Sequence, residues 1–346
     1  MSLRLVCFGL LLGSMATLVA SETVASSSIT TGMDPYVAND VATGLYLGAH
    51  DVSTDSASLA TYAGNTLKLV DLATEAVTDL GNPTDYDLPE DVDGPWNSFV
   101  TYDPAGDSVW VGFTVGGNVD DRIYQVDLAS STWTHQATMP GNFDLEFAGA
   151  TPLVSGTNST NWADPTGIWQ LDTSGADVHD LLIETSGYSA GLGVDSQGNV
   201  YYAANDAAGI YQWAAADVLA AIGTGNMTYA NGLKISEQEA GAYDIEVDAA
   251  DHVFFNGNGA YAFTALWDGT SEAGEYNYDY VAIGSGDFGN WHTLLSASGD
   301  VASGDGALYQ SDWYYFGAAE ITLVPEPAAW VLLTTLLGVG LATWRR

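Results

Sequence analysis

Basic residues are nearly absent from this chain. Its 346 residues include 6 Lys plus Arg against 44 Asp plus Glu, so the formal net charge is −38. Because binding to a nucleic-acid backbone depends on clustered cations, this composition excludes a nucleic-acid partner. Charged residues are only 14% of the chain and apolar residues 47%. The chain therefore does not have the composition of a disordered protein and can build a core.

Cysteine is almost absent as well. Cys7 is the single cysteine, so the chain can form no internal disulfide and no Cys-based zinc site. It lies in a segment where Arg4 precedes a short apolar run and small residues end at Ala20. This order is typical of a secretory signal peptide. We predict a signal peptide over residues 1–25, cleaved after Ala20 or after Ala25, and an exported mature chain without thiols.

The C-terminal end contains the longest uncharged, mostly apolar run. Residues 328–344 carry no charge and precede the terminal pair Arg345 and Arg346. At about 1.5 Å per residue, this run spans roughly 26 Å as a helix, near the lower limit for crossing a hydrocarbon core. We predict a transmembrane helix over 328–344, with both arginines on the cytoplasmic side.

A Pro-Glu-Pro motif stands directly before that run. Pro325, Glu326 and Pro327, the apolar segment and the terminal Arg345 and Arg346 follow one another over residues 324–346. This arrangement resembles the PEP-CTERM sorting signal. The resemblance implies that Pro325, Glu326 and Pro327 are recognised by an exosortase, that the helix holds the chain in the membrane, and that the two arginines stop translocation. It also implies a final location at the cell surface or outside the cell, in a host that makes exopolysaccharide.

The middle of the chain is repetitive. An Ile or Leu followed by an aromatic residue, often with Gln next, recurs at Ile123-Tyr124-Gln125, Ile168-Trp169-Gln170, Ile210-Tyr211-Gln212, Leu266-Trp267 and Leu308-Tyr309-Gln310. A second signal, a short strand entered through an acidic or glycine turn, recurs at Leu59, Val109, Val154, Val200, Val253 and Val301. Both indicate a repeat of about 40–50 residues, which is typical of a four-stranded propeller blade.

These repeats predict an all-β fold. We expect a β-propeller of about six four-stranded blades over residues 40–323, preceded by an N-terminal segment at 26–39 and followed by the sorting signal at 324–346. The alternative is a pair of β-sandwiches of about 150 residues each, which also show closely spaced strands. One helix is expected, over residues 214–222.

Catalytic motifs are not recognisable. Gly187-Tyr188-Ser189-Ala190-Gly191 fits the G-x-S-x-G string, but the residues that follow read as strands, whereas the motif needs a helix there. The five histidines lie far apart in the sequence and form no H-E-x-x-H pair. The sequence therefore predicts no catalytic residue.

Acidic residues in the loops offer a candidate cation site. On the predicted propeller, Asp120, Asp206, Asp287 and Asp305 come from loops that emerge on one face around the central channel. Carboxylate oxygens with few cations nearby suit Ca²⁺, a hard ion. The alternative is that these acids are ordinary solvated surface residues.

The sequence favours a non-catalytic protein of the cell surface or extracellular matrix, handled by exosortase and associated with polysaccharide through exposed Trp and Tyr. The alternative is a secreted propeller enzyme, lactonase-like or lyase-like, that uses a central divalent cation. A receptor-like module that binds a protein at its rim is a third candidate.

Overall fold

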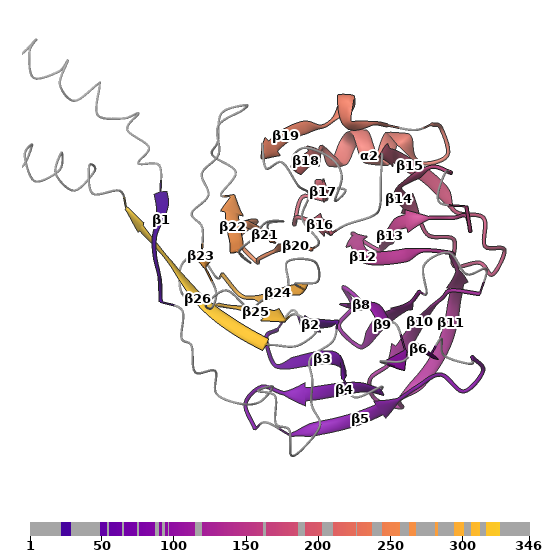
Figure 1. The fold of residues 1–346 in the computed structure, drawn as a ribbon, viewed down its shortest axis with the longest axis horizontal. Coiled ribbons are helices and arrows are strands. Elements are labelled where there is room, and N and C mark those ends of the chain that lie inside the picture. The colour runs from indigo at the N-terminus through magenta and orange to yellow at the C-terminus, as the bar shows by residue number, and fades with distance from the viewer. Residues whose placement is uncertain are drawn as a thin grey trace, which may run out of the picture.

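Strands dominate the part of the chain that the structure describes. The computed structural model describes residues 22–28, 49–53, 55–63, 66–74, 76–86, 90–91, 94–95, 97–114, 120–161, 164–185, 191–202, 210–225, 227–236, 244–256, 263–267, 281–282, 294–300, 306–311 and 316–325. In these residues, six four-stranded antiparallel sheets and one two-stranded sheet are formed (Figure 1).

The first three large sheets follow one another along the chain, and within each the strands run in order from the innermost outward. Sheet 1 contains β2 (His50–Val52), β3 (Ser58–Ala63), β4 (Thr66–Asp71) and β5 (Val77–Gly81). Sheet 2 contains β8 (Asn97–Tyr102), β9 (Ser108–Phe113), β10 (Arg122–Asp127) and β11 (Thr132–Thr138). Sheet 3 contains β12 (Asn142–Ala148), β13 (Thr151–Thr157), β14 (Thr166–Gln170) and β15 (Asp180–Thr185).

The remaining elements complete the fold. Sheet 4 contains β16 (Leu192–Val194), β17 (Val200–Tyr202), β18 (Ile210–Trp213) and β19 (Leu233–Ser236). Sheet 5 contains β20 (Ile245–Val247), β21 (Val253–Asn256), β22 (Phe263–Trp267) and β23 (Val281–Ala282). Sheet 6 contains β24 (Leu294–Ser298), β25 (Ala307–Ser311), β26 (Phe316–Pro325) and β1 (Glu22–Ser28). The short elements are β6 (Glu90–Asp91), β7 (Gly94–Pro95), helix α2 (Ala215–Ala221) and the 3₁₀ turn η2 (Tyr229–Asn231).

The sheets surround a common axis. Their innermost strands contact one another in the order β2, β8, β12, β16, β20 and β24, and β24 contacts β2 again. Figure 1 shows these six strands around the centre of the molecule, with the other strands of each sheet further out. The predicted all-β propeller is thereby confirmed, and the paired sandwiches are wrong.

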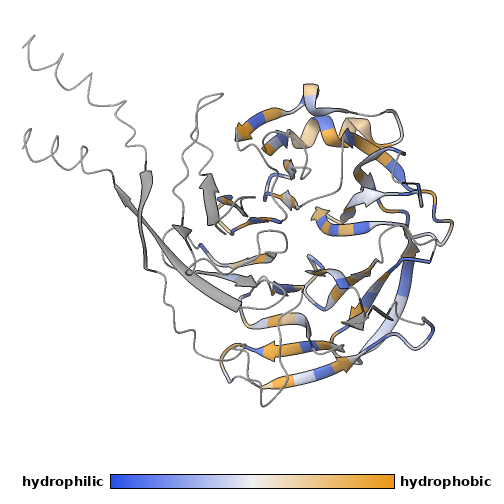
Figure 2. Ribbon diagram, viewed as in Figure 1, coloured by the Kyte–Doolittle hydropathy of each residue, from blue (hydrophilic) through white to orange (hydrophobic). Residues whose placement is uncertain are grey.

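Apolar side chains fill the spaces between neighbouring sheets. Tyr309 of sheet 6 packs in one cluster with Val52, Leu59 and Val70 of sheet 1. Other clusters join sheets 1 and 2, sheets 2 and 3, and sheets 3 and 4. Figure 2 shows the apolar residues recurring along the strands that form these contacts. Because apolar side chains from two sheets fill each of these spaces, each sheet depends on its neighbouring sheets to bury its apolar surface.

The repeated sequence signals map onto equivalent strands in most sheets. The Ile-aromatic or Leu-aromatic signal lies on the third strand of sheets 2 to 5, at Tyr124, Trp169, Tyr211 and Trp267. In sheet 6 it lies on the second strand instead, at Tyr309, so the predicted equivalence is wrong there. Val301, the expected strand anchor of this last unit, lies outside the described residues. The predicted helix is confirmed as α2.

The N-terminal strand completes the last sheet. β1 pairs antiparallel with β26, with Glu22 opposite Pro325 and Ser28 opposite Glu320. Two predicted boundaries therefore fall inside paired strands: the end of the signal peptide at residue 25 and the end of the propeller at residue 323. The predicted helix over 328–344 lies outside the described residues, and no helix within them is long and apolar enough to cross a membrane.

Several large aromatic side chains are buried in the interior. Trp213, Tyr124, Tyr201 and Tyr202 are among the largest fully buried side chains. Among the residues whose burial is described, the exposed large apolar side chains are Val77, Val178, Leu219 and Leu233, none of them aromatic. The expected exposed Trp and Tyr are therefore not found in this part of the protein.

Candidate metal centre in the central channel

An aspartate recurs at the innermost edge of every second sheet. Asp51 lies in β2 and Asp144 in β12, and Asp244 directly precedes β20. Each is followed by a branched apolar residue, and the three are 93 and 100 residues apart. The repeat that carries them therefore spans two sheets rather than one.

The three aspartates make the same pair of backbone hydrogen bonds. One carboxylate oxygen of each accepts from the next N–H along the chain: Val52 to Asp51 at 2.6 Å, Leu145 to Asp144 at 2.8 Å, and Ile245 to Asp244 at 2.9 Å. The other oxygen accepts from the innermost strand of the next sheet: Tyr102 to Asp51 at 2.7 Å, Leu192 to Asp144 at 2.8 Å, and Leu295 to Asp244 at 2.6 Å. Each carboxylate thus ties an odd-numbered sheet to the following even-numbered sheet through strong, charge-assisted bonds.

Two glutamates stand beside these aspartates. Glu146 and Glu246 each lie two residues after an aspartate of the set, whereas Ser53 holds that place in sheet 1. Because alternate residues of a strand point to the same side, each glutamate faces the same side of its strand as the aspartate before it. That side is the central channel.

A small cavity of about 30 Å³ joins all five carboxylates. It is lined by Ala49, His50, Asp51, Ser98, Phe99, Val100, Thr101, Phe143, Asp144, Glu146, Asp244, Glu246 and Leu295. A space of this size holds about two water molecules, or one cation with little else.

A wider cavity of about 300 Å³ adjoins the small one. It shares Asp51, Thr101, Glu146 and Glu246 with the small cavity and continues past the C-terminal ends of the innermost strands. Its further lining contains Ser53, Tyr102, Phe147, Asp195, Ser196, Asp248 and Ser298. The volume is near the lower end of the range for small-molecule sites, and the lining combines hydroxyl groups and carboxylates with apolar residues such as Val52, Val194 and Val247.

Burial disturbs the ionisation of the channel acids. The pKa of Asp51 is raised to about 7 and that of Asp244 to about 6, chiefly because burial disfavours the charged form. Backbone hydrogen bonds from the neighbouring strands oppose both shifts. The pKa values of Asp144, Glu146 and Glu246 are raised well above the ordinary range, first by burial and then by the charges of the other channel carboxylates.

Asp144 and Asp244 affect each other's ionisation. A side-chain hydrogen bond from Asp144 lowers the pKa of Asp244, and the charge of Asp244 raises the pKa of Asp144. Without a bound cation, the channel therefore keeps protons near neutral pH.

Among the described residues that line the two cavities there is no Lys or Arg. Lys68 lies on β4 and pairs with Asp79 at 3.5 Å, and Arg122 lies on β10, 3.9 Å from Asp85. Lys234 lies on β19, the outermost strand of its sheet. The described basic side chains are thus on third and outer strands, so protons or a bound cation must offset the charge of the channel.

The five carboxylates offer oxygen donors, which suit Ca²⁺ better than a softer metal, and His50 adds a ring nitrogen to the lining of the small cavity. Among the described residues, no three of these five carboxylates bring oxygens within 4.8 Å of one another. A cation among them would therefore complete its six to eight ligands with water, and most of that water would have to lie in the adjoining wider cavity, because the small one has room for about two water molecules. The arrangement can bind a hydrated divalent ion, or exchange protons with a ligand in the wider cavity.

The described lining of the two cavities contains none of the acids that the sequence analysis proposed as cation ligands. Asp120 is in an exposed turn before β10, and its predicted role as a cation ligand stays a prediction. Asp206, Asp287 and Asp305 lie outside the described residues. Of the predicted sorting residues, Pro325 is the last residue of β26, and Glu326, Pro327, Arg345 and Arg346 lie outside the described residues.

Comparison with known proteins gives the fold. No family model and no curated protein matches the chain. Among solved structures, a candidate gluconolactonase matches with TM-score 0.55 and 10% identity, over 87% of this chain and 94% of that one. The PQQ-bound aldose sugar dehydrogenase of Streptomyces coelicolor matches with TM-score 0.52 and 15% identity, over 86% and 99%. Regucalcin of Agrobacterium tumefaciens, described as a calcium-binding protein, matches with TM-score 0.52 and 12% identity, over 81% and 90%.

These likenesses establish a β-propeller fold. At such low identities they carry no residue roles, so the activity of this propeller has to be argued from its own channel.

Proposed function

We propose that this chain is an exported β-propeller of the cell surface. We propose further that it binds a divalent cation, of the hard type that Ca²⁺ represents, at the carboxylates of its central channel. The observation that carries the proposal is the convergence of Asp51, Asp144, Glu146, Asp244 and Glu246 on one small cavity whose described lining holds no Lys or Arg. Three of the five are held by paired backbone amides, so the site is organised before a cation arrives. The carboxylate oxygens support calcium.

The wider cavity supports a ligand held through that cation. Its hydroxyl and carboxylate lining fits a hydroxyl-rich molecule such as a saccharide unit of an exopolysaccharide. A free anion would be repelled by Glu146 and Glu246, whereas a bound cation would accept its oxygens. We therefore assign the ligand to the class of neutral or cation-bridged saccharides.

The export part of the proposal rests on the PEP-CTERM resemblance of residues 324–346. The pairing of Glu22 with Pro325 supports it, because it brings the predicted signal peptide and the predicted membrane helix to one end of one strand pair. The same pairing favours cleavage after Ala20, which leaves β1 whole, over cleavage after Ala25. We also propose that the six sheets act as six blades of one cooperative ring.

Calcium titration calorimetry on the exported protein at pH 7.5 tests the channel site. We expect one strong site per chain. Glu146→Gln should weaken it by more than about tenfold, because a charge pair near 4 Å contributes on the order of 4 kcal/mol at an effective dielectric constant of 20. Glu184→Gln, on the exposed side of β15, makes the same chemical change outside the channel and should leave the affinity unchanged. Unchanged binding in Glu146→Gln, or lost binding in Asp120→Asn, would contradict the proposed site.

A second candidate function is a cation-dependent hydrolase or lyase. The observation that favours it is the raised pKa of Asp51 and Asp244, to about 7 and about 6, which suits a general acid or base at neutral pH. A lactone-hydrolysis assay with calcium decides this point. Turnover that disappears in Asp51→Asn while calcium still binds would establish an enzyme, and its absence would leave the binding role.

A further inference from the structure

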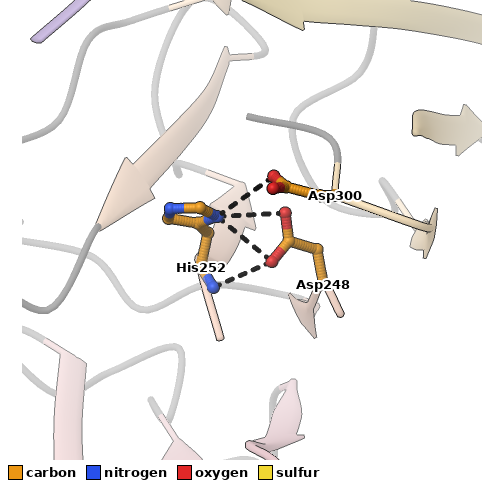
Figure 3. Close-up of side chains that lie close together, drawn as sticks. All are labelled: Asp248, His252 and Asp300. Atoms are coloured by element: carbon orange, nitrogen blue, oxygen red, sulfur yellow. Dashed lines mark hydrogen bonds and ion pairs between the residues drawn. The ribbon is translucent and has the colours of Figure 1, made fainter. Parts of the chain in front are cut away.

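A histidine and two aspartates meet at the hairpin turns of sheets 5 and 6. Asp248 directly follows β20, His252 directly precedes β21, and Asp300 follows β24. The His252 Nδ1 lies 3.2 Å from Asp248 Oδ2 and 3.8 Å from Asp300 Oδ1 (Figure 3). Among the described residues, this is the one group of three metal-ligating side chains whose ligand atoms all lie within 4.8 Å.

The same turn occurs in sheet 4 with a different residue at its end. There, Asp195 accepts hydrogen bonds from the Gln197 and Asn199 N–H groups at 3.0 and 2.8 Å, and the Asn199 side chain donates to it at 2.7 Å. In sheet 5, Asp248 accepts from the N–H groups of Ala250 and His252, both at 2.9 Å.

His252 therefore occupies the position that Asn199 occupies in the turn of sheet 4, where an asparagine is sufficient to form the turn. Its imidazole replaces the Asn199 amide as the group beside the turn aspartate, which shows that a histidine is not required to build this turn. The next sheet places a carboxylate beside the histidine, at Asp300. A ring nitrogen with two carboxylates is a ligand set, not only a turn.

The surrounding contacts hold this group in place. The Ala249 N–H donates to the Gly299 carbonyl at 3.1 Å, which joins the two turns. Asp251, at φ 65°, accepts from both the N–H and the hydroxyl of Ser196, each at 2.8 Å, which joins the turn to sheet 4. The Asp248 side chain is fully buried, that of His252 is 17% exposed and that of Asp300 is 37% exposed. The site is thus rigid on one side and open to solvent on the other.

From this geometry we propose a second metal site, for Zn²⁺ or a similar borderline divalent ion, at His252, Asp248 and Asp300. Ligand atoms bound tetrahedrally at about 2.0–2.1 Å lie about 3.4 Å apart, and the observed separations of 3.2 and 3.8 Å lie on either side of that value. Three protein ligands leave a fourth position open. Asp248 and Gly299 also line the wider cavity, so the proposed site borders that cavity. The bound ion would also join sheet 5 to sheet 6.

Zinc titration of the exported protein at pH 7.5, with saturating calcium present, tests this site apart from the channel. We expect one zinc ion per chain, and Co²⁺ in its place should give the visible absorption of a nitrogen- and oxygen-ligated ion. His252→Asn should weaken zinc binding by more than tenfold, and Asn199 in the equivalent turn indicates that this variant folds. Asp300→Asn changes a more exposed ligand and should weaken zinc binding as well.

Two control variants test whether zinc binds at this site or through the high negative charge of the protein as a whole. His135→Asn changes an exposed histidine on β11, and Asp107→Asn removes an exposed carboxylate from a turn, and both should bind zinc as the unaltered protein does. Calcium binding should be unchanged in His252→Asn. Zinc binding that survives both His252→Asn and Asp300→Asn, that disappears in Glu146→Gln, or that is absent from the unaltered protein would overturn the proposal.

Discussion

Without divalent cations, the melting temperature of the exported protein is expected to fall by roughly 5–10 °C as the pH rises from 5 to 8. The pKa of Asp51 is raised to about 7 and that of Asp244 to about 6 in the folded protein, against 3.8 for an ordinary aspartate. Each unit of displacement corresponds to about 1.4 kcal/mol, and 1 kcal/mol moves the melting temperature of a chain of this size by roughly 2 °C.

The direction follows from proton binding. At pH 5 the folded channel holds protons that the unfolded chain has lost, so proton binding stabilises the fold. As the pH rises through 6 to 7 those protons leave, and the carboxylates of Asp51, Asp144 and Asp244 repel one another. The stabilisation is therefore present at low pH and lost at high pH. Surface acids such as Asp71 and Asp127 have lowered pKa values, so the stability that they contribute is lost only as the pH falls below 5. They therefore do not affect the change between pH 5 and 8.

Calcium should reduce this pH dependence. At a concentration of 100 times its dissociation constant, a ligand of the folded state adds about 2.7 kcal/mol, and its charge replaces the lost protons. Sodium at matched ionic strength supplies screening without coordination and should restore less. His252→Asn should keep the dependence, because His252 lies outside the small cavity. A melting temperature that rises from pH 5 to 8 in the metal-free protein would contradict the account.

Surface-associated protein from the native host is expected to lack the whole apolar tail, and its intact mass should show this directly. If Pro325, Glu326 and Pro327 are the recognition residues, changing all three to Ala should leave a longer chain in the membrane fraction, because the tail stays attached. The N-terminus should begin at Ser21, since removal of residues 1–20 leaves β1 paired with β26. Both ends are read in one mass spectrum.

The matched control for processing is Glu184→Gln, an exposed change on β15 that should be processed as the unaltered chain is. A tail that remains in every cellular fraction would reject exosortase handling. An N-terminus at residue 26 would mean that β1 is cut during export, and would contradict the closure of sheet 6 by the N-terminal strand.

The propeller can be predicted from the sequence because its repeat is a local property. Tyr124, Trp169 and Tyr211 recur on equivalent third strands, and the spacing alone indicates units of four strands. In sheet 6 the repeat places Tyr309 on the wrong strand, because the innermost strand β24 directly precedes the strand that carries Tyr309. The outermost strand of this sheet comes from the other end of the chain, which a scan for consecutive repeats does not find.

Four of the five channel acids, Asp51, Glu146, Asp244 and Glu246, escape sequence reasoning for a different reason. On an isolated strand, Asp144 and Glu146 alternate with apolar residues and look like a solvent-facing edge. Only the closed ring turns that side toward Asp51 and Asp244. One signal is present in the sequence: each of the three aspartates precedes a branched apolar residue at a spacing of about two units. The His252 site can likewise be found by comparing its turn with that of Asp195 and Asn199.

Anomalous diffraction from crystals of the exported protein grown with calcium, and with Mn²⁺ as a stronger scatterer, shows whether a cation occupies the channel. We expect a peak in the small cavity, among Asp144, Asp244, Glu146 and Glu246, with water completing the coordination. A cavity that holds only water at saturating calcium and neutral pH, with peaks confined to surface acids such as Asp120, would contradict the proposed channel site.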